Sequence, residues 1–195
     1  MKSIAPIQGQ HAWLRPLAEN DATFLFELRN DAELTRFVND GPRTLEQQQG
    51  WMRSYFGRDN DLNYVVISQS SGTPVGTVAL YDIDGADRHA EQGRWLVRQD
   101  SLAAVEADFL LNRHAFETFG LHLVHFSVCA LNAKVLRYHI RCGARWIKSA
   151  PAYFQKQGVP YDSELFELSR EAFQQVKKPM LEKALYRRIS TNAHA

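Results

Sequence analysis

Four cysteine and histidine side chains lie in a pattern that could bind a metal. His125 and Cys129 fall on one face of an expected strand, and His139 and Cys142 fall on one face of the next expected helix. Two Cys and two His could hold zinc, but structural zinc sites usually clip short loops through more closely spaced cysteines. Such residues in a strand–helix unit are more often part of the core, so we expect no metal.

A carboxylate in a strand-like segment is a candidate proton acceptor. In AEQGRWLV (90–97), an extended backbone places Glu91, Gly93 and Trp95 on one face. A carboxylate beside an indole in a closed cleft has its pKa raised, which suits a general base. The alternative is an ordinary solvated charge on a half-exposed strand, and the residues alone leave both open.

Turn signals divide the chain into short alternating elements that would position these groups. Strands are expected at 11–17, 63–69, 75–83, 88–98, 122–130, 145–155 and 163–170. Helices are expected at 22–30, 31–38, 45–56, 102–119 and 132–143, with a helical tail from 171 that Pro179 interrupts. This order predicts an α/β fold with a mixed sheet and helices on both faces. We expect one domain over residues 1–170 and a C-terminal helical extension over 171–195.

Composition excludes several classes of partner. The chain has 195 residues, of which 23 are Lys or Arg and 22 are Asp or Glu, so its formal net charge is +1. That balance gives no electrostatic reason to expect nucleic acid or a membrane surface as the partner. There are two cysteines and no apolar leader or transmembrane run, so we expect free thiols in the cytoplasm.

The segment GRWLVRQDSLAAV…CGARW (93–146) resembles the core of the GNAT acetyltransferases, especially the branch of RimJ/RimL-like enzymes and amino-sugar acetyltransferases. The matching motifs are AFETFGLHL, which closes a helix, and Asn132, which opens the next helix. LRNDAEL and LEQQQGWM are similar to segments of flagellin-sugar acetyltransferases. The resemblance covers about residues 12–170. It implies a six- to seven-stranded, mostly antiparallel sheet with two splayed central parallel strands.

The resemblance also implies acetyl-CoA as the acyl donor, bound where the two parallel strands separate. The family's pyrophosphate loop, R/Q-x-x-G-x-G/A, opens a long helix whose N-terminus attracts an anion. Here Gln99 and Ala104 fit, but Leu102 stands in place of Gly and Asp100 adds a negative charge; a simple helix cap at Asp100 or Ser101 is the alternative. The implied cofactor-binding residues are Leu96, Val97, Gln99, Ser101, Leu102, Ala103, Ala104, Asn132 and Arg137.

Three residues are implied as catalytic. Glu91 stands where related enzymes carry a glutamate, which suggests the general base. Many family members protonate the departing thiolate with a Tyr that lies four residues before the glycine at the end of the helix. Counting back from Gly143 gives His139 rather than Tyr138. Adjacent helix positions differ by about 100°, so only one can point at the sulfur; we favour His139, and core packing is the alternative for Tyr138.

The acceptor side follows from the same resemblance, because the first helices and the last hairpin line the acceptor cleft in the family. The implied substrate-binding residues are Arg29, Asn30, Trp51, Tyr81, Tyr153 and Tyr161. Arg29 could bind a phosphate or carboxylate. We therefore expect an N-acetyltransferase acting on a primary amine, with a nucleotide-linked amino sugar as the leading acceptor. A peptide α-amine, or a domain that binds acyl-CoA without turnover, remains open, and so does the choice between monomer and homodimer.

Overall fold

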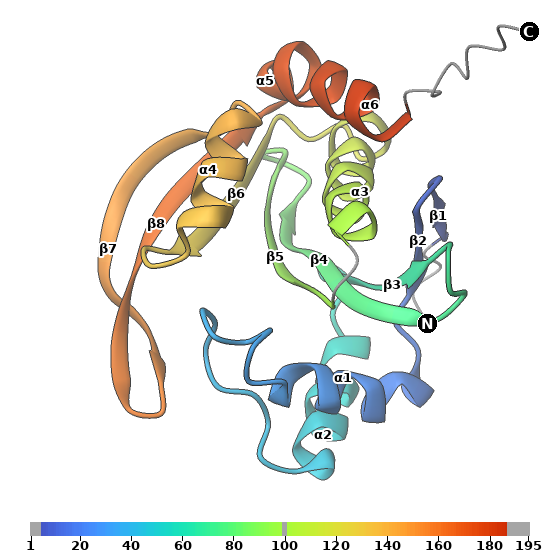
Figure 1. The fold of residues 1–195 in the computed structure, drawn as a ribbon, viewed down its shortest axis with the longest axis vertical. Coiled ribbons are helices and arrows are strands. Elements are labelled where there is room, and N and C mark those ends of the chain that lie inside the picture. Colours follow the sequence, from blue (N-terminus) through green and yellow to red (C-terminus); the bar gives the residue numbers. More distant parts are fainter. Residues whose placement is uncertain (1–4, 99–100, 187–195) are drawn as a thin grey trace, which may run out of the picture.

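The computed structural model describes residues 5–98 and 101–186, which form one mixed sheet flanked by helices on both faces (Figure 1). The strands are β1 Ile7–Gln8, β2 Ala12–Pro16, β3 Leu62–Ser68, β4 Pro74–Asp84, β5 His89–Val97, β6 Leu123–Cys129, β7 Arg145–Lys156 and β8 Val159–Ser169. Their spatial order is β1-β2-β3-β4-β5-β6-β8-β7. The predicted mixed, mostly antiparallel sheet is confirmed, with eight strands rather than six or seven.

The helices lie in two groups on opposite faces of the sheet (Figure 1). A 3₁₀ turn at Glu19–Asp21 leads into α1 Ala22–Asn30, and α2 Leu45–Phe56 follows on the same face. The other face carries α3 Ser101–Arg113 with its π-helical end His114–Thr118, α4 Ala133–Arg141, α5 Arg170–Ala172, the π turn Phe173–Lys177 and α6 Lys178–Tyr186. None of the described helices combines the length and hydropathy that crossing a bilayer requires.

Local capping explains where the predicted helices succeed and fail. Thr44 caps α2 as its position predicts, because its hydroxyl accepts a hydrogen bond from the Gln47 amide. The helix expected over 31–38 is wrong: this segment is a run of turns. The Asp31 carboxylate accepts from the Leu34 amide at 3.1 Å, and the Thr35 hydroxyl donates to the Asp31 carbonyl at 2.6 Å. Such local side-chain bonds compete with helical ones.

Strand β3 separates two hydrophobic cores. Tyr64 and Val66 belong to the main core, which α3 and the tail complete. Val65 and Ile67 face the other way and pack with Met52 of α2 in a smaller core. Because the side chains of a strand alternate between faces, an unbroken apolar run is what a strand covered on both faces requires.

The parallel strands β5 and β6 separate after three pairs of residues. Their register joins His89–Glu91 to Leu123–His125, and Glu91 with His125 is the last pair. Beyond it, β5 runs on to Val97 and β6 to Cys129, and these two strands do not pair with each other in the described sheet. The predicted splay is therefore confirmed, and we call this V-shaped opening the V, with Glu91 and His125 at its apex.

A β-bulge in β5 reverses one of our expectations. Ala79 pairs with Gly93 and Thr77 with Leu96, so β5 carries one extra residue at this point. Arg94 has a φ of 51°, and Trp95 turns to the face that carries α3, where its indole Nε1 donates to the Ala104 carbonyl at 3.1 Å. The prediction that Glu91, Gly93 and Trp95 share one face is therefore wrong, because a bulge shifts the alternation by one residue.

The tail packs on its own domain. Phe173 is fully buried in the main core, and Leu181 and Leu185 are buried beside it. Pro179 does not interrupt the helical run. It follows the π turn Phe173–Lys177, where the regular bonding between residues i and i−4 is already interrupted.

The tail also places a charge inside the core. The Lys177 ammonium lies 2.7 Å from the Asp108 carboxylate of α3, and the two side chains are 1% and 0% exposed. Gln92 of β5 donates to the same carboxylate at 2.7 Å, and Tyr138 of α4 donates at 2.5 Å. Burial alone would raise the pKa of Asp108, but the Lys177 charge and the hydrogen bonds outweigh it and hold that pKa below its ordinary value.

Replacing Lys177 by Met should lower the free energy of unfolding by about 3–5 kcal/mol, because it leaves the Asp108 charge buried without its cation. Lys178→Met is the matched control, since Lys178 pairs with Glu117 where both side chains are about one-third exposed; its cost should stay below about 1 kcal/mol. Urea unfolding followed by circular dichroism measures both. Equal losses in the two variants would contradict a special role for the buried pair.

Candidate active site

Glu91 lies at the apex of the V and faces away from α3. Its neighbour Ala90 is buried in the main core, and its neighbour Gln92 reaches Asp108 of α3, so the alternating strand turns Glu91 to the opposite face. We call that side of the sheet, which also carries α1 and α2, the α1–α2 face. Burial, with a smaller contribution from Asp82, raises the pKa of Glu91. The direction is the predicted one, although the neighbour is not Trp95.

Tyr81 lies beside Glu91 on the same face. The two residues are cross-strand partners, and the Tyr81 ring lies against Gly93 so closely that a Cβ there would sit 2.6 Å from the phenol oxygen. The Arg94 guanidinium covers the ring at 4.4 Å from its centroid. Burial first, and then the charge of Glu91, raises the pKa of Tyr81. The phenol therefore stays protonated at neutral pH and can donate a hydrogen bond next to Glu91.

A cavity of about 440 Å³ opens between the helices α1 and α2 and the strands β4 and β5. Arg29, Trp51 and Arg94 line it together with the polar side chains of Gln48, Asn63 and Thr77. This mixture of aromatic, cationic and amide groups suits a polar ligand with a planar part.

The two arginines of the cavity differ in how their charges are balanced. Arg94 makes a two-pronged pair with Asp61, at 2.5 and 3.0 Å. Arg29 instead donates to the carbonyls of Asn39 and Asp40 and to the Asn39 amide oxygen, each at 3.1 Å. Burial, and then the charge of Arg94, lowers the pKa of Arg29. Arg29 thus presents a cation to the cavity whose hydrogen-bond partners are neutral.

The tip of the β7–β8 hairpin touches the loop that forms one wall of this cavity. Lys156 donates its ammonium to the Thr35 carbonyl at 2.6 Å, and the Gln157 amide donates to the Asp40 carboxylate at 2.9 Å. Asp40 also lines the cavity. Through these two hydrogen bonds the hairpin braces the α1–α2 loop; Figure 1 shows β7 and β8 as a long curved ribbon on the same side of the molecule as that loop.

The structure brings together some of the predicted substrate residues and not others. Arg29 and Trp51 line the cavity, and Tyr81 lies at the apex. The Asn30 side chain instead donates to the carbonyls of Phe26 and Pro42, which shapes the loop. Tyr153 and Tyr161 belong to the hairpin. Tyr153 is 47% exposed, and Tyr161 stacks on Phe154 with 5.3 Å between ring centroids.

Sequence reasoning missed six polar residues of the cavity: Asn39, Asp40, Gln48, Asn63, Thr77 and Arg94. Arg94 reaches the cavity through the bulge, which no local residue pattern announces. Gln48 lies one turn beyond the Thr44 cap on the buried side of α2, and that helical spacing was the one signal available.

The residues predicted to bind the donor are spread over the end of β5, the start of α3 and the helix α4. Leu102, Ala103 and Ala104 lie in the first turn of α3, and Asn132 caps α4 by accepting from the Val135 amide. The Leu102 side chain lines a separate hollow with His11 and Gln69, so it points toward the β2–β3 side. Val97 ends β5, Leu96 is buried and lines the cavity, and Arg137 is exposed on α4. Gln99 and Asp100 lie outside the described residues, and the Ser101 side chain is likewise not described.

The expected acid, His139, is buried in the core. It packs against Phe126 at 4.2 Å and Trp95 at 5.7 Å between ring centroids, and burial lowers its pKa to about 4. At neutral pH its imidazole is therefore uncharged and cannot act as an imidazolium acid. Tyr138 is also engaged, since its hydroxyl donates to Asp108, and burial raises its pKa well above the ordinary value. We therefore withdraw the general-acid expectation for His139, and Tyr138 belongs to the buried network.

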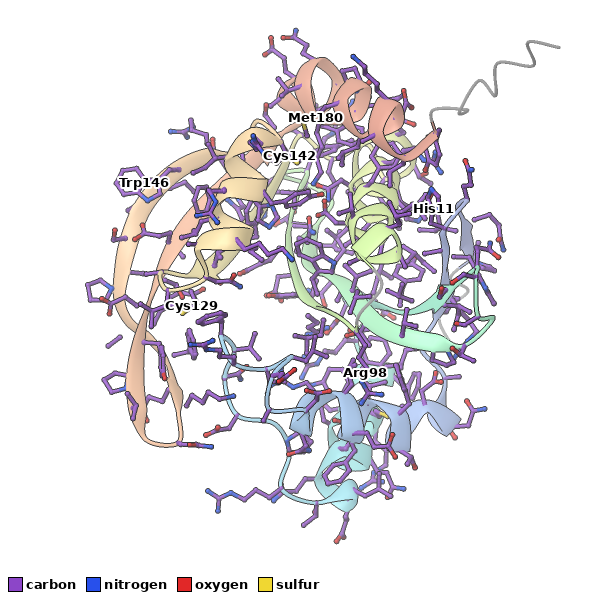
Figure 2. The ribbon with its side chains drawn as sticks, in the orientation of Figure 1. His11, Arg98, Cys129, Cys142, Trp146 and Met180 are labelled. Carbon is purple, nitrogen blue, oxygen red and sulfur yellow. The ribbon has the colours of Figure 1, made fainter. Side chains whose placement is uncertain are left out.

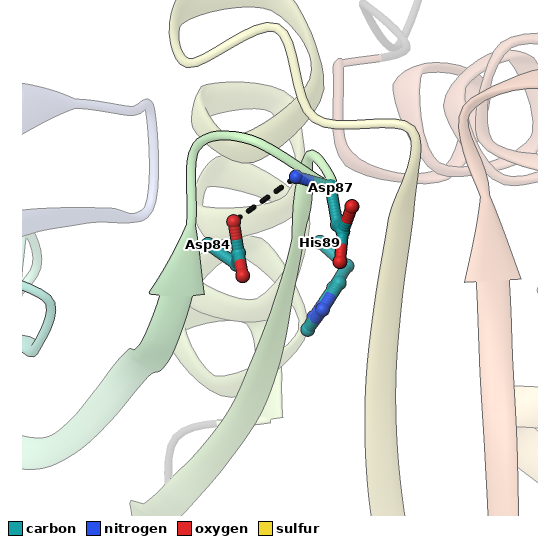
Figure 3. A group of neighbouring side chains, drawn as sticks. All are labelled: Asp84, Asp87 and His89. Atoms are coloured by element: carbon teal, nitrogen blue, oxygen red, sulfur yellow. Dashed lines mark hydrogen bonds between the residues drawn. The ribbon is translucent and has the colours of Figure 1, made fainter.

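The Cys and His residues considered for zinc do not gather in one place. Cys129 and Cys142 are buried and free, and Figure 2 shows them at opposite ends of α4. A different group, Asp84, Asp87 and His89, brings its potential ligand atoms within 4.8 Å of one another (Figure 3). Its geometry belongs to the β4–β5 turn, because Asp84 Oδ1 accepts from the Ala86 and Asp87 amides at 2.8 and 3.0 Å.

Comparison with known proteins adds a family to this geometry. The acetyltransferase (GNAT) domain model matches residues 11–145. No curated protein matches the chain. Among solved structures, a candidate acetyltransferase superposes with a TM-score of 0.80 at 24% identity, covering 96% of this chain and 97% of that one.

Two further solved structures share the fold. Apo FdhC, a nucleotide-linked sugar GNAT, has a TM-score of 0.75 at 24% identity, covering 93% and 98% of the two chains. The spermidine N-acetyltransferase of Vibrio cholerae, solved with CoA and spermine, has a TM-score of 0.76 at 18% identity, covering 86% and 100%. With the family model matching most of its length, the chain belongs to the GNAT acetyltransferase family and is an N-acetyltransferase.

Proposed function

We propose that this enzyme transfers the acetyl group of acetyl-CoA to the primary amine of a small molecule that also carries an anionic group, with a nucleotide-linked amino sugar as the leading acceptor. One observation carries the proposal: the α1–α2 face holds a half-buried carboxylate, Glu91, and a half-buried cation, Arg29, with Tyr81 and Arg94 linking them. Tyr81 is the cross-strand partner of Glu91, the Arg94 guanidinium lies over the Tyr81 ring, and Arg94 and Arg29 line the same cavity.

The carboxylate of Glu91 suits the amine of such an acceptor, and the guanidinium of Arg29 suits its anionic group. The ammonium would lie near Glu91, and a phosphate would lie near Arg29, where a guanidinium can bind two oxygens at once. Trp51 lines the cavity and adds apolar contact area for a nucleobase or a sugar beside Tyr55 and Arg94, which lie over its ring. Spermidine, a polycation, fits this cavity less well than an anionic acceptor, because Arg29 has only neutral hydrogen-bond partners and would repel it.

The chemistry assigned to the chain begins with a proton. Glu91 accepts it from the ammonium, which leaves a lone pair on the nitrogen. The Tyr81 hydroxyl orients the reacting groups by a hydrogen bond. Bound acetyl-CoA supplies the thioester carbon; the new N–C bond forms as the C–S bond breaks.

The donor would occupy the V. The edge of β5 beyond Glu91 has no β6 partner in the described sheet, so its peptide groups can pair with an extended amide chain. We propose that Leu96, Val97, the first turn of α3, Asn132 and Arg137 hold the donor. The Leu102 side chain points toward Gln69 and does not fill this space, so its presence in place of Gly does not block the donor. The two buried free thiols fit the cytoplasm that we propose as the compartment.

The acceptor class can be tested by thiol release with acetyl-CoA and a panel of amines. We expect turnover with amino-sugar nucleotides and little with spermidine or peptides, after calorimetry has shown that CoA binds. Preference for peptides would instead support the alternative in which the acceptor is a peptide α-amine. Failure to bind CoA at high micromolar concentration would refute catalysis altogether.

Arg29→Gln should lower kcat/KM for the anionic acceptor by roughly 10- to 100-fold, the loss expected for a charged hydrogen bond. The KM for acetyl-CoA should stay unchanged because Arg29 lies on the acceptor side. Arg43→Gln is the control, since Arg43 is an exposed residue of the same loop. If both variants behave alike with the anionic acceptor, the assignment of Arg29 is wrong.

Glu91→Gln should lower kcat by roughly 10²- to 10⁴-fold, the usual contribution of a general base. The wild-type rate should fall as the pH drops through the pKa of Glu91, because the carboxylate must be unprotonated to accept a proton. Since that pKa is raised, the fall should occur above the pH at which an ordinary glutamate titrates. The variant should lose this acidic limb, while Glu46→Gln, an exposed change on α2, should keep it. A Glu91→Gln enzyme with normal turnover would exclude the base role.

A further inference from the structure

We propose that His125 carries a proton from Glu91 toward solvent: it receives the proton that Glu91 takes from the amine and passes it on. It acts through Glu91 and is in that sense a positioning residue. The proposal rests on the proposed function, because it needs Glu91 as the base. It goes beyond that function in naming the route by which the proton leaves.

Stoichiometry requires such a route. An ammonium carries three hydrogens on nitrogen and the amide product carries one, so two protons leave the nitrogen in each turnover. One of them ends on the CoA thiol. The other must leave the site before Glu91 can act again, and Glu91 is half-buried.

The sheet places His125 next in line. Glu91 and His125 are the last pair of β5 and β6, and His125 is in turn the partner of Glu167 in β8. Neighbouring strands lie about 4.8 Å apart. Val124 and Phe126 are buried in the main core, so His125 turns to the α1–α2 face, as Glu91 does.

The same row continues to solvent. Glu167 pairs with Arg145 of the edge strand β7, which donates to it from Nε at 2.8 Å and from Nη2 at 2.5 Å. The Arg145 side chain is 70% exposed. The row therefore runs from the apex of the V to the outer edge of the sheet, with His125 between two carboxylates.

The charges around His125 suit a transient proton carrier. The His89 ring contacts that of His125, and Glu91 of β5 and Glu167 of β8 are its register partners, with Arg145 beyond. Burial, and to a lesser degree His89, lowers the pKa of His125, while Glu167 raises it. The resting imidazole is therefore neutral at pH 7 and can accept a proton, and the Glu167 carboxylate stabilises the imidazolium that forms.

The direct test is the pH dependence of kcat in His125→Gln. We expect kcat to fall by roughly tenfold or more at low buffer concentration, with KM for both substrates unchanged and the acidic limb of the profile altered. Added imidazole should restore the rate, because it can carry the proton in place of the missing side chain. His122→Gln is the matched control: His122 lies just before β6, is exposed and contacts Arg88 at 3.2 Å, outside the row of Glu91, His125 and Glu167, so it should keep the wild-type profile.

A second variant tests the proposal if His125→Gln does not fold. Glu167→Gln removes the carboxylate that supports the protonated imidazole, so the pKa of His125, followed by NMR, should fall and kcat should fall with it. Normal kcat across the pH range in His125→Gln would overturn the proposed role of His125, and so would a loss of kcat that imidazole does not restore. An inactive wild type on every amine would instead refute the proposed function, which keeps the two failures apart.

Discussion

The arrangement of the V depends on the contacts that the buried carboxylate of Asp108 makes with three other elements. Lys177 comes from the tail, Gln92 from β5 and Tyr138 from α4, and all three meet this one group on α3. A charge inside the core is tolerated only when every partner is in place. The network therefore fixes how far α3 and α4 stand from β5, and the tail of the chain is part of the architecture of the V.

Strand β5 serves both sides of the sheet because it carries two irregularities close together. It loses its pairing with β6 after Glu91, and it bulges against β4 at Arg94. The first opens an edge toward the donor side. The second leaves Glu91 and Arg94 on the α1–α2 face while Trp95 packs under α3. A regular strand would put Trp95 where the acceptor cavity now opens.

The sequence predicted what local chemistry decides. Capping residues and apolar spacing placed α1, α2 and the strand order, and Arg29 and Trp51 reach the cavity from helices whose faces the apolar pattern defines. Contacts between distant segments were not predictable in this way. The bulge at Arg94 depends on β4, and the burial of His139 depends on packing against β5 and β6. Both errors arose because strand alternation and helix spacing are local patterns, whereas contacts with distant segments decided where Trp95 and His139 lie.

The two faces of the sheet divide the acid–base chemistry unequally. On the α3 side, His139 is held neutral and Tyr138 protonated by burial, so neither exchanges a proton readily near neutral pH. On the α1–α2 face, Glu91 has a raised pKa and His125 rests neutral. This asymmetry matches the reaction, because an alkylammonium has a pKa of about 10 and needs a base to lose its proton. A thiol has a pKa of about 8.5, so the thiolate can depart with little help from an acid. Proton-transfer groups are thus needed mainly where the amine binds, and the fold gathers them on the α1–α2 face, where we propose that it does.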